Sequence, residues 1–170
     1  MFVFLNGQFV PEEKALVSVF DRSFLYGDGL FETMLVRNGR PFRFDQHLER
    51  LRQGSDFVRI HVPFSDTAIG QFASELISRN NLPDCILRLT LSRGVGVRGY
   101  SPRGADQPVL VMTLHPAQSL DPVRPPTWRL ATASFRLPAH EPLARFKTCN
   151  KLAQVLARAE AEAQRADEAL

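Results

Sequence analysis

Residues 26–33, Tyr-Gly-Asp-Gly-Leu-Phe-Glu-Thr, lead from a glycine-rich turn into a strand that continues to Val36. The two glycines permit a close backbone approach and backbone angles that other residues avoid. Successive side chains of a strand point to opposite faces, so Phe31 and Glu32 face different sides of the predicted sheet. We expect Phe31 to fill the core, and Glu32 and Tyr26 to form the wall of a pocket.

Two hairpins are predicted in the first 44 residues. The first covers residues 2–10, where Asn-Gly at 6–7 supplies the positive backbone angles of a tight turn. The second pairs the strand 29–36 with a return strand over residues 40–44, and its turn is Asn-Gly at 38–39. The chain is therefore expected to begin with antiparallel pairing.

Two helices follow the hairpins. Asp45 is suited to cap the first helix, which runs to about Gln53 and stops at Gly54. Ser65 is suited to cap the second, in which apolar residues recur at intervals of three and four. The apolar residues of the second helix are Ile69, Phe72, Ala73, Leu76 and Ile77.

The next part of the chain predicts two strands and a linker. Residues 86–92 alternate between apolar and polar side chains, which is typical of a half-buried strand. Residues 109–114 are more continuously apolar, so we expect this strand to be covered on both faces. Residues 116–127 hold four prolines and no usable periodicity, which favours an interdomain linker.

A second domain is predicted from Trp128. It contains a strand over residues 128–135, a loop with prolines and a helix over residues 150–165. The helix residues expected to face inward are Leu152, Val155, Leu156 and Ala159. The fold class is therefore α/β of the α+β type: an N-terminal domain (1–115) with a small mixed or antiparallel sheet and two helices, the linker, and the beginning of a larger second domain (128–170).

The composition is that of a globular protein, because 44% of the 170 residues are hydrophobic and 23% are charged. The net charge of +3 gives no argument for a nucleic-acid partner, and no apolar run is long enough for a membrane span. Cys85 and Cys149 fit a reducing cytosol, and the N-terminus lacks the features of a signal peptide, so we expect a cytoplasmic protein. The four histidines lack metal-ligand spacing, so no metal site is predicted.

Lys147 lies in the tract 146–150, Phe-Lys-Thr-Cys-Asn, between a region of loop and strand and a strongly helical segment. A lysine at such a junction is held at the mouth of a pocket, where its amine can lose water and bond covalently to a carbonyl compound. The alternative is a surface lysine that caps loop carbonyls.

Four tracts in this order, 26–33, 47–51, 93–104 and 146–150, resemble those of the fold-type IV pyridoxal-phosphate enzymes, the class IV aminotransferases. That family contains branched-chain aminotransferases, D-amino-acid aminotransferases and aminodeoxychorismate lyases. The resemblance covers essentially the whole chain. It implies pyridoxal 5'-phosphate as the cofactor, a small amino compound as the substrate, and a homodimer in which both subunits contribute to each pocket.

The resemblance also implies roles for single residues. Lys147 is the catalytic lysine that holds the cofactor, and Arg50 is the arginine that binds its phosphate. Helical spacing alone favours a different role for Arg50, an exposed side chain paired with Glu49 or Asp45. Glu32 is a further cofactor-binding candidate, although some lyase relatives carry a threonine there, which weakens a lyase role for this position.

The substrate-binding candidates are Tyr26, Arg98 and Tyr100. Arg98 lies in the glycine- and arginine-rich loop 93–104, which is suited either to clamp a substrate carboxylate or to remain an exposed hairpin loop. Residues 94–99 also match the dinucleotide-binding pattern, but that motif must open into a helix and here a loop continues. A nucleotide- or nucleic-acid-binding module is therefore the alternative from another functional class.

Within the family, the tract 99–101 resembles aminodeoxychorismate lyases, which release pyruvate and leave 4-aminobenzoate for folate synthesis. Branched-chain or D-amino-acid transfer is the alternative reaction, because it uses the same lysine and cofactor. Family members continue beyond the point that matches Leu170, into an acidic residue for the pyridine nitrogen and a helix N-terminus for the phosphate. We therefore expect a fragment or shortened relative that is inactive as the 170-residue chain alone.

Overall fold

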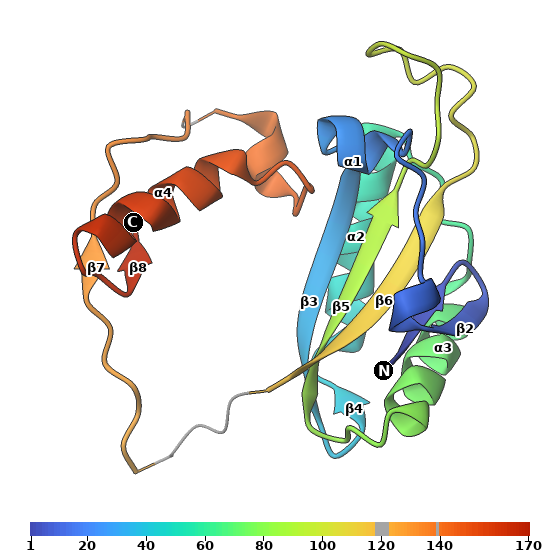
Figure 1. Ribbon diagram of the computed structural model, residues 1–170, viewed down its shortest axis with the longest axis horizontal. Coiled ribbons are helices and arrows are strands. Elements are labelled where there is room, and N and C mark those ends of the chain that lie inside the picture. The colour runs from blue at the N-terminus through green and yellow to red at the C-terminus, as the bar shows by residue number, and fades with distance from the viewer. Residues whose placement is uncertain (118–122, 139) are drawn as a thin grey trace. The chain divides into compact units, whose positions relative to one another are not determined.

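The computed structural model describes residues 1–117, 123–138 and 140–170 (Figure 1). The chain forms two compact units. The first contains Met1–Ala117 and Phe146–Cys149, and the second contains the described residues between Gln118 and Arg145 together with Asn150–Leu170. Residues 118–122, in the middle of the predicted linker, lie outside the described residues.

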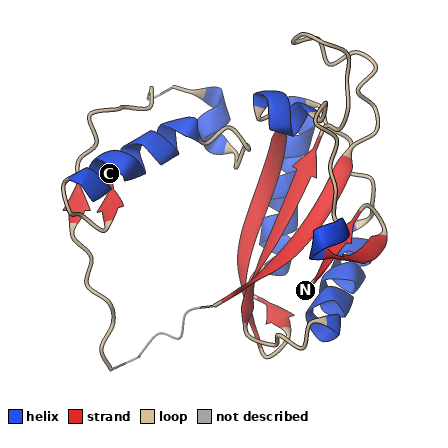
Figure 2. Cartoon of the chain, viewed as in Figure 1, coloured by secondary structure: helices blue, strands red, loops and turns tan. Residues whose placement is uncertain are grey.

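The first unit is built on a six-stranded sheet in the order β2-β1-β6-β5-β3-β4, and every neighbouring pair is antiparallel (Figures 1 and 2). This confirms the predicted fold class of a small antiparallel sheet with helices. The strands are β1 (Phe2–Leu5), β2 (Gln8–Pro11), β3 (Gly29–Arg37), β4 (Arg40–Pro41), β5 (Cys85–Ser92) and β6 (Val109–Pro116).

Both predicted Asn-Gly turns are present. Asn6 and Gly7 have φ angles of 47° and 93° between β1 and β2, and Asn38 and Gly39 have 49° and 75° between β3 and β4. Both residues of each turn therefore use the left-handed region that this dipeptide tolerates well. The return strand is shorter than predicted and ends at Pro41.

The helices of the first unit are α1 (Arg22–Tyr26), α2 (Phe44–Val58) and α3 (Asp66–Arg79), and η1 (Glu12–Lys14) is a 3₁₀ turn. Ser65 caps α3 as predicted, because its side chain accepts a hydrogen bond from the Ala68 N–H. Both predictions for the ends of α2 are wrong: its N-cap is Arg43 rather than Asp45, and Gly54 lies inside the helix. A Cβ at this position would lie 3.2 Å from Leu30 Cδ1, so the glycine lets the helix approach β3 closely.

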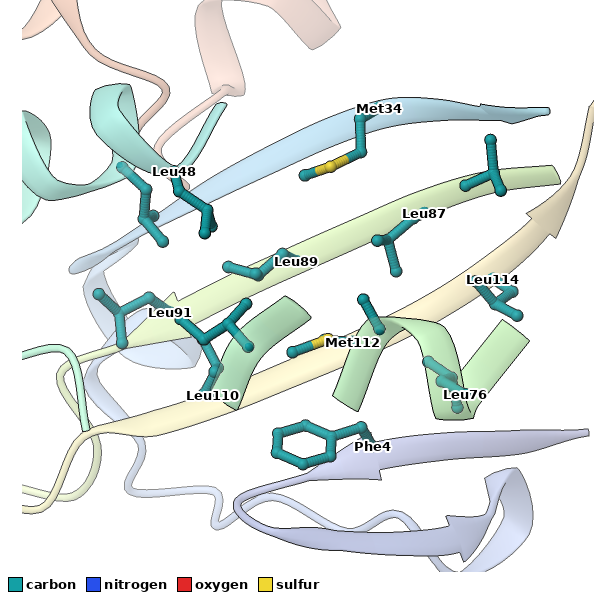
Figure 3. Close-up of a cluster of buried hydrophobic side chains, with 14 of the residues drawn as sticks. Phe4, Met34, Leu48, Leu76, Leu87, Leu89, Leu91, Leu110, Met112 and Leu114 are labelled. Carbon is teal, nitrogen blue, oxygen red and sulfur yellow. The ribbon is translucent and has the colours of Figure 1, made fainter. Parts of the chain in front are cut away.

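One face of the sheet carries the hydrophobic core (Figure 3). Alternate residues of β3, β5 and β6 pack there against α2 and α3, as the alternation in residues 86–92 predicts. Residues at less than 3% exposure include Leu30, Met34, Leu48, Leu76, Leu87, Leu89, Leu91, Leu110, Met112 and Leu114. The expectation that residues 109–114 are covered on both faces is wrong within this unit, because Val109, Val111 and Thr113 are only half-buried.

The tract 146–149 groups with the first unit, whereas the sequence places it in the second domain. Its backbone extends the sheet beside β3. The Phe31 N–H donates to the Lys147 carbonyl at 2.8 Å, and the Cys149 N–H donates to the Gly29 carbonyl at 2.8 Å. These long-range hydrogen bonds fix the tract against the strand that begins the sequence stretch 26–33.

The second unit contains α4 (Leu152–Ala163), η2 (Pro142–Arg145) and two parallel two-residue strands, β7 (Leu130–Ala131) and β8 (Glu168–Ala169). The predicted strand 128–135 is thus much shorter, and the helix begins at Leu152. Two strands of this size cover little of the helix, so the residues predicted to face inward are exposed: Leu152 at 65%, Val155 at 60% and Leu156 at 50%. Within α4, Ala161 is the buried residue.

Among the described residues, no helix combines the length and apolar character needed to cross a bilayer. The same residues contain no cluster of three or more histidine, cysteine, aspartate or glutamate side chains that is suited to hold a metal ion.

Candidate active site

Lys147 lies at the edge of the sheet, on the side of β3 where Gly29, Leu30 and Phe31 begin the strand. Its backbone is held by the hydrogen bonds described above, and Thr148 forms a bridge with Leu30. The side chain is half-buried. A lysine fixed in this way has a defined position for its amine, as covalent chemistry requires.

The Lys147 amine shares an aromatic ring with a second cation. Its Nζ lies 4.8 Å from the centre of the Phe31 ring, and the guanidinium carbon of Arg88 lies 4.0 Å from the same centre. Such contacts orient a cation through the negative face of the ring. Phe31 therefore brings two positively charged groups to one place on the sheet.

Phe31 does not fill the core, which corrects the expectation drawn from the sequence. Leu30, Glu32 and Met34 take the buried face of β3, so the odd-numbered Phe31 must point to the opposite face. In register, Phe31 pairs with Thr90, and the next pair on that face is Thr33 with Arg88. These side chains are half-buried, and within the first unit both long helices pack on the other face.

Arg50 of α2 binds Glu32 of β3 in a bidentate pair. Arg50 Nε donates to Glu32 Oε1 at 2.7 Å, and Nη2 donates to Oε2 at 2.6 Å. His47, one turn earlier on α2, lies with its Nδ1 2.7 Å from Glu32 Oε2. Glu32 is only 1% exposed, so its carboxylate is held from above by two side chains of the helix.

The Arg50–Glu32 pair differs from the surface pairing that helical spacing favours for Arg50. The bidentate partner is Glu32 rather than Glu49 or Asp45. Glu32 is buried beneath the helix, so it does not form an open pocket wall in this unit. The hydrogen bonds that Arg50 donates to the Glu32 carboxylate raise the pKa of Arg50 above its usual value, so the guanidinium is charged at every working pH.

Arg50 suits an external anion. Its side chain is 42% exposed, and Nη1 has no hydrogen-bond partner among the residues that the structure describes. Nε and Nη2 are already used, and Glu32 fixes the plane of the guanidinium. A phosphate oxygen approaching Nη1 would meet a donor whose direction is set in advance.

Tyr26 and Tyr100 are brought together across 74 positions of sequence, with ring centres 5.5 Å apart. The Gly99 N–H donates to the Tyr26 hydroxyl at 3.3 Å. Arg98 and Tyr100 have exposed side chains, so the loop offers them to the surroundings. The predicted substrate-binding residues therefore share one part of the first unit.

A family model for class IV amino-transferases matches residues 29–170, which include Glu32, Arg50, the glycine- and arginine-rich loop and Lys147. The chain belongs to the class IV aminotransferase family. Enzymes of this family use pyridoxal phosphate, and one solved neighbour contains pyridoxamine 5'-phosphate.

Three relatives illustrate the match. The protein named "Putative branched-chain-amino-acid aminotransferase" of Methanocaldococcus jannaschii is 35% identical over 172 residues, covering 99% of this chain and 58% of its own length. The branched-chain aminotransferase of Thermoproteus uzoniensis, solved with norvaline, has a TM-score of 0.87 at 27% identity, over 99% of this chain and 58% of that one. The 4-amino-4-deoxychorismate lyase of Pseudomonas aeruginosa has a TM-score of 0.74 at 34% identity, over 93% and 56%. The chain thus spans less than two thirds of each relative's length.

Three residues that lie in this candidate site were not predicted from the sequence as site residues: Phe31, His47 and Arg88. Strand alternation placed Arg88 on the face opposite the leucines, which was a usable signal. Helical spacing was the signal for His47, because it lies three residues before Arg50. The roles of Lys147, Arg50, Glu32, Tyr26, Arg98 and Tyr100 stay predictions.

Proposed function

We propose that the complete protein is a pyridoxal 5'-phosphate-dependent 4-amino-4-deoxychorismate lyase, which releases pyruvate and leaves 4-aminobenzoate. The observation that carries the proposal is Lys147, whose backbone is bound to β3 and whose amine lies over Phe31 beside Arg88. Amino transfer is the second candidate, as in a branched-chain or D-amino-acid aminotransferase, and the relative from Methanocaldococcus jannaschii supports it.

The residues present fit the cofactor. Pyridoxal phosphate, when bound, withdraws electrons from the bonds next to the substrate nitrogen. Lys147 would bind its aldehyde covalently, and Arg50 would bind its phosphate through the guanidinium that Glu32 orients. Glu32 would thus act on the cofactor through Arg50, because its own carboxylate is buried.

Lys147 has a second proposed role, in proton transfer. Its free amine would move a proton at the substrate carbon next to the nitrogen. The Phe31 ring, which lies 4.8 Å from Nζ, would limit the positions that the amine can take at the sheet face. Arg88, over the same ring, would bind a negatively charged group of the substrate.

The number of cations favours a substrate with more than one carboxylate. Arg88 on the sheet face and Arg98 on the loop offer two separate guanidinium groups. Aminodeoxychorismate has two carboxylates, which supports the lyase, as does the 34% identity to the Pseudomonas aeruginosa enzyme. Glu32 in place of the threonine of some lyases supports amino transfer instead.

The reaction is decided by a paired assay on the complete, cofactor-loaded protein. We expect pyruvate release from 4-amino-4-deoxychorismate to be at least about tenfold faster than amino transfer from branched-chain L-amino acids or D-alanine to 2-oxoglutarate. A faster transfer reaction would make the protein an aminotransferase. If neither reaction is detected and the protein shows no cofactor absorbance, the result would favour the nucleotide-binding alternative. That alternative has a weakness, because residues 94–99 are not followed by the helix that the motif requires.

Arg50→Ala is expected to weaken cofactor binding by about 1.5–3 kcal/mol, the range for a lost hydrogen bond to a charged group. Glu32 keeps His47 as a partner, so the protein should still fold, with lower stability. Absorbance titration with pyridoxal 5'-phosphate measures the affinity. Arg52→Ala on the same helix is the control, because Arg52 binds Asp66 and the Phe64 carbonyl. Equal affinity in both variants would remove Arg50 from the cofactor site.

We also propose that the complete protein is a cytoplasmic homodimer. Its first unit exposes a run of large apolar side chains between η1 and the end of α1, an arrangement that marks interaction surfaces. They are Leu16, Val17, Val19, Phe20, Phe24 and Leu25, at 46–78% exposure. Phe20→Glu with Phe24→Glu is expected to convert the dimer to monomer in sedimentation velocity. A wild-type monomer at assay concentration would rule the dimer out.

A further inference from the structure

Arg22, the first residue of α1, is a buried arginine that binds a loop far away in sequence. Its side chain is only 4% exposed. Nη1 donates to the carbonyl oxygens of Gly99 at 3.0 Å and Ser101 at 3.1 Å, and Nη2 donates to that of Tyr100 at 3.1 Å. Three successive carbonyls of the loop therefore converge on one guanidinium.

Arg22 also connects the loop to the end of α2, through Asp28 and Arg93. Arg22 Nε donates to Asp28 Oδ2 at 2.7 Å, and the same carboxylate accepts from Arg93 Nε at 2.8 Å and Nη2 at 3.0 Å. Arg93 also donates to the carbonyls of Val58 and Arg59, both at 2.8 Å, where α2 ends. A continuous chain of charge-assisted hydrogen bonds thus runs from the helix to the loop.

The carboxylate of Asp28 keeps this cluster charged. Burial alone would raise the pKa of Asp28, but the hydrogen bonds and charges of Arg93 and Arg22 outweigh it and lower the pKa below its usual value. Asp28 is therefore ionised at neutral pH and compensates part of the buried positive charge. Because an unpaired buried charge is strongly destabilising, both arginines are confined to their partners.

The loop is held mainly through its backbone, and of its two functional side chains Tyr100 contacts the Tyr26 ring edge-on. Gly96 packs so closely on Arg22 that a Cβ there would lie 2.9 Å from Arg22 Cδ. The Gly99 N–H donates to the Tyr26 hydroxyl. In contrast, the side chains of Arg98 and Tyr100 remain exposed. The loop conformation is thus fixed while these two side chains are available to a ligand.

We propose that Arg22 is a positioning residue, which holds the backbone of residues 99–101 so that Arg98 and Tyr100 are presented to a substrate carboxylate. The inference rests on the proposed function, because it assigns this loop to substrate binding. Arg22 acts on the loop through the backbone carbonyls of these three residues. Because Arg22 orders the loop before the substrate arrives, substrate binding does not cost the conformational entropy of ordering it. Arg22 is therefore expected to affect KM more than kcat.

Arg22→Lys in the complete protein tests the proposal. A lysine amine has three donors on one atom and cannot reach three carbonyls and a carboxylate as the planar guanidinium does. We expect KM for 4-amino-4-deoxychorismate, or for 2-oxoglutarate if the protein is an aminotransferase, to rise about tenfold. The value of kcat is expected to change less than about twofold, with unchanged affinity for pyridoxal 5'-phosphate.

A second variant and a structural measurement accompany the kinetics. Gly96→Ala pushes against the stem of Arg22 from the loop side, so it is expected to change KM in the same direction. Hydrogen exchange should become faster over residues 95–104 in both variants. Arg52→Lys is the matched control, since Arg52 also binds a carboxylate and a backbone carbonyl but lies away from this loop in sequence.

The outcomes separate the two proposals. A raised KM with faster loop exchange, absent in Arg52→Lys, supports the positioning role. Faster exchange with unchanged KM overturns it, as does unchanged exchange, and so does a parallel loss of kcat and cofactor affinity. Failure of the proposed function is recognised differently, because the wild-type protein would then neither bind the cofactor nor turn over either substrate, and the inference would fail with it.

Discussion

Lys147→Ala in the complete protein is expected to lower kcat/KM by at least about 10³-fold, since the variant loses both the covalent bond to the cofactor and the proton-transfer group. The backbone of residue 147 should stay in place, because its carbonyl rather than its side chain accepts the Phe31 N–H. The variant is therefore expected to fold like the wild type. Turnover in the paired assay measures the loss.

Covalent labelling tests this assignment, because it separates Lys147 from the other two lysines of this chain, Lys14 and Lys151. Borohydride reduction makes the lysine–cofactor bond permanent, and peptide mass mapping then locates it. We expect the label on Lys147, and full activity in Lys14→Ala, whose side chain lies on the 3₁₀ turn η1. A label on any other lysine of the complete protein would contradict the assignment.

Local patterns predicted several elements whose cause is local, although the Asp45 cap was wrong because α2 begins at Phe44. The Asn-Gly turns, the Ser65 cap and the alternation of β5 each depend on residues within a few positions of one another, and each is present. Gly54 shows the limit of such reasoning. A glycine near a helix end is ambiguous, and its contact with Leu30, which places it inside α2, comes from another element.

The geometry of the candidate site depends on contacts between residues far apart in sequence, which local patterns do not show. Glu32 and Arg50 are 18 positions apart, and the family resemblance named both without showing that they bind each other. Arg22 reaches carbonyls 77–79 positions away, which sequence spacing cannot predict. The sequence pattern placed the tract 146–149 in the second domain, whereas it groups with the first unit, because its hydrogen bonds to β3 are long-range.

Gly29→Ala is expected to destabilise the complete protein by about 3 kcal/mol or more, the upper range for overpacking a site that cannot relax. An added Cβ would lie 2.2 Å from Ser23 Oγ, 2.6 Å from the Leu91 carbonyl oxygen and 3.3 Å from Cys149 Sγ. Ser23 can rotate away, but the Leu91 oxygen belongs to the backbone of β5. Urea unfolding with linear extrapolation measures the change in the free energy of unfolding.

Gly70→Ala is the matched control, because it adds the same methyl group inside α3, where the nearest atom, Phe44 Cε1, is 3.4 Å away. Alanine favours a helix over glycine, so this variant is expected to be neutral or more stable by up to about 1 kcal/mol. A Gly29→Ala protein within about 0.5 kcal/mol of wild type would show that the start of β3 is not tightly packed.

The Gly29 carbonyl also accepts the Cys149 N–H. Displacing the Gly29 backbone should therefore slow borohydride labelling of Lys147. The glycine that permits the close approach of β3 to Ser23 and β5 also fixes, through Cys149, the backbone beside the proposed catalytic lysine.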